Sequence, residues 1–147
     1  MTPPDENPAL KGRMVLLIED DAIMLRALGH AFQRAGCRII GSRDGEEGLK
    51  RFLERTPDLV VTDILMPNRE GVETILAMKS HAPAVKILAI SGGGRIGADQ
   101  ILDLARRIGA DAVLPKPFRS AEIVALAHRL LAPDGEAGGA ATSGKDP

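Results

Sequence analysis

An apolar run that ends in three acidic residues, Met14-Val15-Leu16-Leu17-Ile18-Glu19-Asp20-Asp21, stands near the start of the chain. Five consecutive apolar residues are typical of a β-strand that is buried on both faces. Residues 22–35 then carry apolar side chains at helical spacing, and Gly36 ends that pattern. The stretch therefore predicts a buried strand followed at once by a helix.

The same alternation of strand-like and helix-like stretches continues to residue 131. Asp44 is placed to cap a second helix, with Glu47 at the reciprocal position of a capping box. Five such units predict an α/β fold, a doubly wound five-stranded parallel sheet with helices on both faces. The further strands are expected over residues 38–40, 59–62, 86–90 and 112–114, and the further helices over residues 45–55, 71–81, 98–108 and 120–131.

The two ends of the chain differ in composition from the middle. Residues 1–10 carry three prolines and two acids, and residues 133–147 are rich in Gly, Ala and Pro. Segments that bury so little apolar surface cannot offset the entropy lost on ordering. We therefore expect disordered tails over residues 1–10 and 133–147, around one folded domain over residues 11–132.

The composition of the whole chain argues against several classes of protein. The 147 residues carry a net charge of −1 and only 2% aromatic residues, which disfavours direct nucleic-acid binding. The one cysteine, Cys37, can form neither an internal disulfide nor a Cys-rich zinc site. No apolar run approaches the ~20 residues of a membrane span, and the acidic N-terminus is unlike a signal peptide. We therefore expect a cytoplasmic protein without membrane insertion.

Chemically active residues stand at the ends of the predicted strands. Glu19 and Asp20 end the first strand, Asp63 the third and Ser91 the fourth, and Lys116 follows the fifth. Ligands of doubly wound sheets bind beyond the carboxyl ends of the strands, so these side chains are expected to meet. Several carboxylates in one place stay ionised only with a cation, and oxygen-only ligands suit Mg²⁺ or Mn²⁺. Since a carboxylate can also act as a nucleophile toward phosphorus, the group predicts phosphorylation of an aspartate.

These segments together resemble the response-regulator receiver domains of two-component signalling. The resemblance covers about residues 13–131, nearly the whole predicted domain. It implies a flavodoxin-like (βα)5 fold with strand order 2-1-3-4-5. The segments that carry it are residues 15–21, Asp63-Ile64-Leu65-Met66-Pro67 with Glu70-Gly71, Ile90-Ser91, and residues 109–118, which include Pro115-Lys116-Pro117-Phe118.

The resemblance also implies a role for each site residue. Asp63 would accept the phosphoryl group, and Ser91 would bond one of its oxygens. Lys116 would pair with Asp63 or its phosphate, and the Lys116–Pro117 bond would be cis. The metal ligands would be Asp20 and Asp63 directly, Glu19 through water, and the backbone carbonyl of Leu65. Asp21 is instead expected to serve the N-terminal end of the first helix.

The chain departs from the family pattern at two places. Receivers usually carry Tyr or Phe three residues before the lysine, and this chain has Val113 there. Residues 91–97 contain four glycines, which predict a mobile loop. The Gly92-x-Gly94-x-x-Gly97 spacing imitates a dinucleotide fingerprint, but it follows the fourth strand instead of opening a βαβ unit. Both departures concern how phosphorylation would change the rest of the domain. Neither removes a residue that the predicted phosphorylation needs.

The main hypothesis is a stand-alone receiver that acts as a phosphorylation-dependent switch in a phosphorelay. Its donor would be a sensor histidine kinase or a histidine phosphotransfer protein. We expect it to be a monomer or weak dimer, whose output is protein contact or onward phosphotransfer. It would not be an enzyme beyond assisting its own phosphorylation and slow dephosphorylation.

Two alternatives remain at this point. The chain can be an interaction module that keeps the receiver fold and signals without phosphate, which the Val113 position and the glycine-rich loop motivate. It can also be a small metal-dependent phosphohydrolase with an Asp nucleophile. Against the second alternative, the first strand lacks an Asp-x-Asp ending, and no cap domain is visible to exclude water from a substrate.

Overall fold

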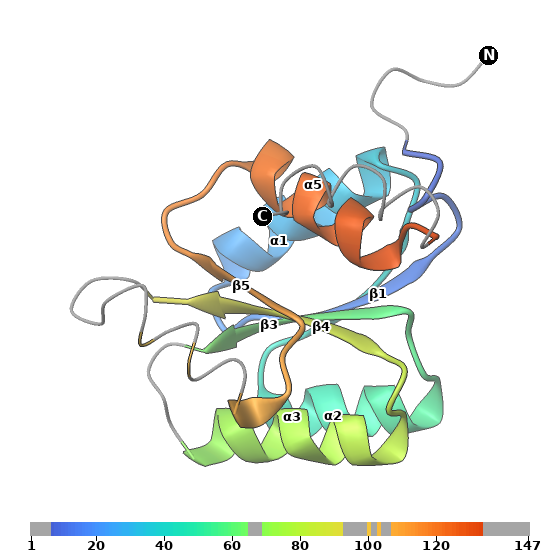
Figure 1. Cartoon of the computed structure of the whole chain (residues 1–147). Helices are drawn as coiled ribbons and strands as arrows, with labels where there is room; N and C mark the ends of the chain where they lie inside the picture. The colour runs from blue at the N-terminus through green and yellow to red at the C-terminus, as the bar shows by residue number, and fades with distance from the viewer. Residues whose placement is uncertain (1–6, 65–68, 93–99, 101–102, 104–106, 134–147) are drawn as a thin grey trace, which may run out of the picture.

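Five parallel strands form one sheet between two layers of helices in the computed structural model (Figure 1). The structure describes residues 7–64, 69–92, 100, 103 and 107–133. The strands are β1 (Met14–Ile18), β2 (Arg38–Ser42), β3 (Leu59–Ile64), β4 (Lys86–Ser91) and β5 (Ala112–Pro115). The helices are α1 (Ala22–Arg34), α2 (Gly45–Glu54), α3 (Arg69–His81) and α5 (Ser120–Leu131).

The strand order is β2-β1-β3-β4-β5, as the family resemblance implies. Helices α1 and α5 lie on one side of the sheet, and α2 and α3 lie on the other (Figure 1). The predicted helix over residues 98–108 falls largely outside the described residues; those of it that are described, Gln100, Asp103, Arg107 and Ile108, are helical. The doubly wound α/β prediction is therefore confirmed.

Alternate residues of the strands feed two separate cores. Leu17, Val61 and Leu88 pack toward α1 and α5, together with Phe32 and Ile123. Their neighbours Leu16, Val60 and Ile87 pack toward α2 and α3, together with Phe52 and Met78. All five residues of β1 are buried, as the unbroken apolar run predicts for a central parallel strand.

Strands β2 and β3 are each two residues longer than their apolar patterns predict. Gly41 and Ser42 extend β2 because they pair with Leu17 and Ile18 of β1. In β3 the extension includes Asp63, which pairs with Ile90 of β4. Asp63 therefore lies within the ladder, one residue before the strand ends.

The two predicted helix caps are present, one of them in altered form. Asp21 Oδ1 accepts hydrogen bonds from the backbone N–H groups of Ile23 (2.9 Å) and Met24 (3.3 Å) at the start of α1. Asp44 Oδ1 accepts from the N–H of Glu47 at 2.7 Å at the start of α2. The Glu47 carboxylate, however, accepts from the N–H of Arg43 at 3.2 Å, one residue before the cap. The reciprocal half of the predicted capping box is thus shifted by one residue.

The folded part begins earlier than the predicted boundary at residue 11. Asn7 donates its backbone N–H to the carbonyl of Ala35 at 3.0 Å, and its side-chain oxygen lies 2.7 Å from Nδ1 of His128 on α5. Leu10 is fully buried in the core beneath α1. The prediction of a disordered tail is therefore wrong for residues 7–10, because the hydrogen bonds of Asn7 and the burial of Leu10 both hold the segment on the domain. Residues 1–6 and 134–147 lie outside the described part of the chain.

Two aspartates tie the amino ends of the strands together. Asp58 Oδ2 accepts the N–H of Met14 at 2.9 Å, and Arg13 pairs with Asp58 at 3.4 Å. Asp111 Oδ2 accepts the N–H of Ile87 at 2.8 Å and the ammonium of Lys79 at 2.9 Å. These carboxylates link neighbouring strands, and in the second case also α3, at the edge of the sheet opposite the predicted site.

The Asp111→Ala variant is expected to lose about 1–3 kcal/mol of unfolding free energy, since Ile87 N–H and Lys79 both lose an acceptor. Urea denaturation followed by circular dichroism measures the change. The control is Asp103→Ala, whose ion pair with Arg107 is solvent-exposed and should contribute less than about 1 kcal/mol. Equal effects of the two substitutions would contradict this role for Asp111.

Cys37 is a buried residue just before β2, and its Sγ lies 3.5 Å from the carbonyl oxygen of Leu10. Burial, aided by the charge of Asp58, raises the pKa of its thiol to about 11. The thiol is therefore protonated at pH 8 and should react with iodoacetamide only when the chain unfolds. Mass spectrometry with and without urea tests this; alkylation of the native protein at the unfolded rate would contradict it.

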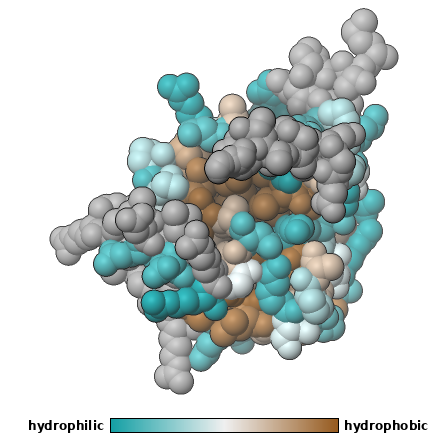
Figure 2. All heavy atoms as spheres, viewed as in Figure 1, coloured by the Kyte–Doolittle hydropathy of each residue, from teal (hydrophilic) through white to brown (hydrophobic). Residues whose placement is uncertain are grey.

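The described part of the chain has an apolar region on one face and an edge strand beside it. Apolar side chains gather over α5 and the adjoining edge of the sheet on the face seen in Figure 2. Strand β5 is the edge strand there, and none of its residues is fully buried. Among the described residues, no helix has the length and apolarity needed to cross a membrane.

Candidate functional site

The candidate site lies at the carboxyl edge of the sheet, where the ends of β1, β3, β4 and β5 meet. Glu19 directly follows β1 and is 1% exposed, whereas Asp20 beside it is exposed. The Asp63 side chain, at the end of β3, is 5% exposed. The parallel pairing of β1 with β3 in register Ile18–Thr62 brings these residues to one place.

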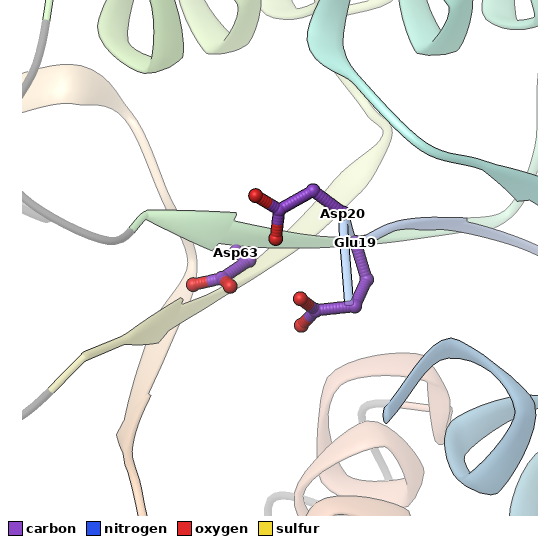
Figure 3. A group of neighbouring side chains, drawn as sticks. All are labelled: Glu19, Asp20 and Asp63. Atoms are coloured by element: carbon purple, nitrogen blue, oxygen red, sulfur yellow. The ribbon is translucent and has the colours of Figure 1, made fainter. Parts of the chain in front are cut away.

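Three carboxylates point into a common space at this edge (Figure 3). One oxygen from each of Glu19, Asp20 and Asp63 lies within 4.8 Å of the others. An all-oxygen set at this separation suits a hard divalent cation such as Mg²⁺ or Mn²⁺. The predicted ligands Glu19, Asp20 and Asp63 are therefore brought together, whereas Leu65 lies outside the described residues.

Lys116 provides the positive charge beside this cluster. Its Nζ donates a hydrogen bond to Asp63 Oδ2 at 3.1 Å and lies 3.7 Å from Glu19 Oε1. The backbone N–H of Lys116 donates to the carbonyl of Ser91 at 3.0 Å, which fixes the turn after β5 against β4. The Lys116–Pro117 peptide bond is cis, as the resemblance implies. The predicted pairing of Lys116 with Asp63 is thus present.

Three buried oxygens of the site have no hydrogen-bond partner among the described residues: Glu19 Oε1, Asp63 Oδ1 and Ser91 Oγ. Buried polar atoms normally find partners, because leaving one unsatisfied costs roughly 1–3 kcal/mol. Two of these atoms belong to the carboxylate cluster, and the third ends the strand that pairs with β3. The donors and acceptors left open therefore fit both a cation and the oxygens of a phosphoryl group.

Burial dominates the electrostatics of Glu19. Desolvation, reinforced by the charge of Asp63, raises the pKa of Glu19 to about 7, although the Asp21 N–H at 3.1 Å and the charge of Lys116 oppose the rise. For Lys116, burial alone would lower the pKa, but the hydrogen bond and charge of Asp63 outweigh it and the pKa is raised. The site therefore holds a firmly charged ammonium beside a carboxyl group that ionises reluctantly without a cation.

A pocket opens over the cluster, and part of its wall was not predicted. Arg43, Asp44 and Gly45 line it from the turn between β2 and α2, and Thr74 lines it from α3. Arg43 donates from Nε (3.2 Å) and Nη2 (3.1 Å) to the backbone carbonyl of Asp20. Arg43 and Asp44 directly follow β2, so their position beyond a strand end was a signal in the sequence that they could line the site. The position of Thr74 depends on how α3 packs and gave no signal in the sequence.

Comparison with known proteins assigns the family. Residues 15–128 match the family model of the response regulator receiver domain. The chain belongs to this family. Its signalling class is therefore the two-component systems, as the sequence predicted.

Curated relatives and solved structures agree with this assignment. The receiver is 32% identical over 117 residues to the transcriptional regulatory protein CpxR of Escherichia coli (strain K12), covering 80% of this chain and 48% of CpxR. It is 33% identical over 117 residues to the transcriptional regulatory protein PrrA of Mycobacterium tuberculosis, covering 80% of this chain and 49% of PrrA. A putative response regulator from Chloroflexus aurantiacus matches with a TM-score of 0.73 and 26% identity over 84% of this chain and 100% of that one. The receiver thus spans about half the length of the curated relatives it matches.

The receiver's departures from the family pattern lie next to the site. Val113 is half-buried and packs against the core cluster beneath α2 and α3. Within the glycine-rich loop, Ser91 and Gly92 are described, and residues 93–97 lie outside the described part. The three histidines are not part of the carboxylate cluster: His30 and His81 are exposed, and His128 contacts Asn7.

Proposed function

We propose that this receiver is a phosphorylation-dependent switch in which Asp63 accepts a phosphoryl group. The observation that carries the proposal is the state of the Asp63 carboxylate. One oxygen is held by Lys116 at 3.1 Å, and the other is buried, without a partner among the described residues, beside two further carboxylates. A carboxylate oriented in this way is a nucleophile with one oxygen fixed and the other open to an incoming phosphorus.

The proposed donor is a phosphohistidine of a sensor histidine kinase or a histidine phosphotransfer protein. An oxygen of Asp63 forms the new P–O bond as the P–N bond to the imidazole breaks and the imidazole leaves. Lys116 stays charged through the step and stabilises the phosphoryl oxygens, and the Ser91 hydroxyl supplies a donor for one of them. Glu19, Asp20, Asp63 and the backbone carbonyl of Leu65 would hold Mg²⁺ (or Mn²⁺), which supplies charge neutralisation when bound.

The proposed output is protein contact or onward phosphotransfer in the cytoplasm, from a monomer or weak dimer. The net charge of −1 and the scarcity of aromatic residues support an output without direct nucleic-acid contact by this chain. The proposal includes no enzymatic role beyond self-phosphorylation and slow hydrolysis of the aspartyl phosphate. The expectation of a stand-alone receiver stays a prediction, because the matched residues cover only 48% of CpxR.

The test is the intact mass of the protein after incubation with Mg²⁺ and a small acyl phosphate such as acetyl phosphate. We expect one added phosphoryl group, absent when a chelator replaces Mg²⁺. No addition to the folded protein in Mg²⁺ would overturn the proposal. If the phosphoryl group is added equally well in chelator, only the proposed requirement for Mg²⁺ is overturned.

A second candidate function is an interaction module that signals without phosphate. The observation that favours it is Val113, which is already packed in the core where the family usually carries a mobile aromatic ring. The affinity of a partner, once one is isolated, would then be the same with and without beryllofluoride as the phosphoryl mimic. Unequal affinities would exclude this second function.

A further inference from the structure

Residues of α2 and α3 line a groove beside the pocket over Asp63. Leu49 and Ala77 line it, and its remaining lining consists of Asp44, Glu46, Glu73 and Thr74. Three of these six residues are acidic, and no basic residue is among them. Leu49 and Ala77 are half-buried, whereas Asp44, Glu46 and Glu73 are exposed, so the groove is apolar inside and acidic along its rim.

The apolar lining extends beyond the groove onto an exposed leucine of α2. Leu53 is 52% exposed, one of three large hydrophobic side chains exposed among the described residues. It lies four residues after Leu49, so it continues the same face of α2 by one turn. On α3, Leu76 lies two residues after Thr74, which meets α2 at Gly45, so Leu76 lies on the other side of α3 and is not part of this surface. An apolar surface of this kind next to a groove is typical of an interaction site.

Charge and apolar surface are separated along the groove. Both helices start near the carboxyl edge of the sheet, so Asp44, Glu46 and Glu73 lie toward that edge and the exposed Leu53 lies farther along α2. Asp44 and Thr74 also line the pocket over Asp63, so the acidic end of the groove adjoins the site. An occupant must therefore offer positive charge at one end and apolar side chains along the rest.

We propose that this groove docks an amphipathic helix of a partner protein, with lysine or arginine residues at the end nearest Asp63. Two parallel helices present a groove into which the ridge of a third helix packs. The apolar stripe of the partner would cover Leu49, Leu53 and Ala77, and its basic residues would face Asp44 and Glu46. Charge complementarity of this kind selects against acidic helices as well as attracting basic ones.

The test uses the unphosphorylated full chain, so it does not depend on the proposed phosphorylation. The probe is a synthetic helical peptide with leucines at i, i+4 and i+7 and a lysine-rich end; the matched control peptide carries glutamate in place of each lysine. We expect saturable binding of the lysine peptide with Kd below about 1 mM. In the ¹⁵N-labelled protein its chemical-shift changes should centre on α2 and α3. The glutamate peptide should bind at least about tenfold more weakly.

Matched variants locate the contact. The Leu53→Gln variant should weaken binding about tenfold or more, and Leu53 is exposed, so the fold should persist. Ile23→Gln is the control, because Ile23 is 81% exposed on α1 across the sheet and its loss should leave the affinity unchanged. Glu46→Lys should reduce the difference in affinity between the lysine peptide and the glutamate peptide.

Four outcomes would overturn the proposal. They are the absence of saturable binding, shift changes centred on α1 or α5, and equal effects of the leucine and Ile23 substitutions. The fourth is a dimer of the free chain in sedimentation that the Leu53→Gln variant dissociates, since a second copy would then occupy the groove.

Discussion

The Asp63→Asn variant is expected to accept no phosphoryl group from acetyl phosphate in Mg²⁺, under conditions in which the wild-type protein accepts one. The asparagine has nearly the same shape as aspartate but lacks the nucleophilic carboxylate oxygens. It also removes the negative charge that pairs with Lys116 at 3.1 Å. Intact-mass spectrometry gives the stoichiometry, and circular dichroism shows whether the variant is folded.

A matched control for this variant is Asp44→Asn. Asp44 lines the same pocket as Asp63, so the substitution removes one negative charge from the same surroundings. Asparagine is as good a helix cap as aspartate, so α2 should keep its start. We expect Asp44→Asn to be labelled to the wild-type stoichiometry. Stoichiometric labelling of Asp63→Asn would instead place the acceptor on another residue, with Asp20 as the first to examine.

The Glu19→Gln variant is expected to be more stable than the wild-type protein in chelator at pH 8, by about 1–3 kcal/mol of unfolding free energy. In the folded protein the pKa of Glu19 is raised to about 7, mainly by burial, from an ordinary value of 4.5. As pH rises from 4.5 to 7, the unfolded chain releases a proton that the folded chain retains, and the wild-type protein loses stability. Above pH 7 the loss is complete and stays constant. The neutral glutamine avoids it and can still accept the Asp21 N–H that Glu19 accepts at 3.1 Å.

Urea denaturation at pH 5 and pH 8 in chelator tests this dependence. The advantage of Glu19→Gln should be small at pH 5 and large at pH 8. Saturating Mg²⁺ should reduce or reverse it, because a cation that binds only the folded protein stabilises the wild type. An advantage that is equal at the two pH values would show that the ionisation of Glu19 is not the cause, and destabilisation at pH 8 would contradict the prediction outright.

The parts of the fold that the sequence predicts well are those that depend on local chemistry. The apolar run of β1 and the caps Asp21 and Asp44 each carry a pattern of their own, and each is found where it was expected. The carboxyl ends of parallel strands lie at one edge of the sheet. The sequence therefore predicts that five site residues meet there: Glu19, Asp20, Asp63, Ser91 and Lys116. That step requires only that the strands be parallel, which their alternation with helices predicts.

The parts that the sequence did not predict depend on packing between distant segments. Leu10 looks like a tail residue until α1 and α5 provide a core to receive it. The Glu47 carboxylate could reach either of two adjacent N–H groups, and only the folded turn selects Arg43. Thr74 borders the pocket because α2 and α3 approach closely: a Cβ built on Gly45 would lie 2.8 Å from Thr74 Oγ1. No spacing rule within one segment reports on such contacts.

The two edges of the sheet use their aspartates in opposite ways. At the amino edge Asp58 and Asp111 are satisfied by strand N–H groups and by Arg13 or Lys79. At the carboxyl edge Asp63 keeps a buried oxygen that no residue in the described part of the chain satisfies. Protein engineers can therefore treat the molecule as a scaffold with one fixed end and one open to redesign. A library that varies residues around Asp63 should retain mostly folded members, whereas the same diversity around Asp111 should be depleted by any screen for soluble expression.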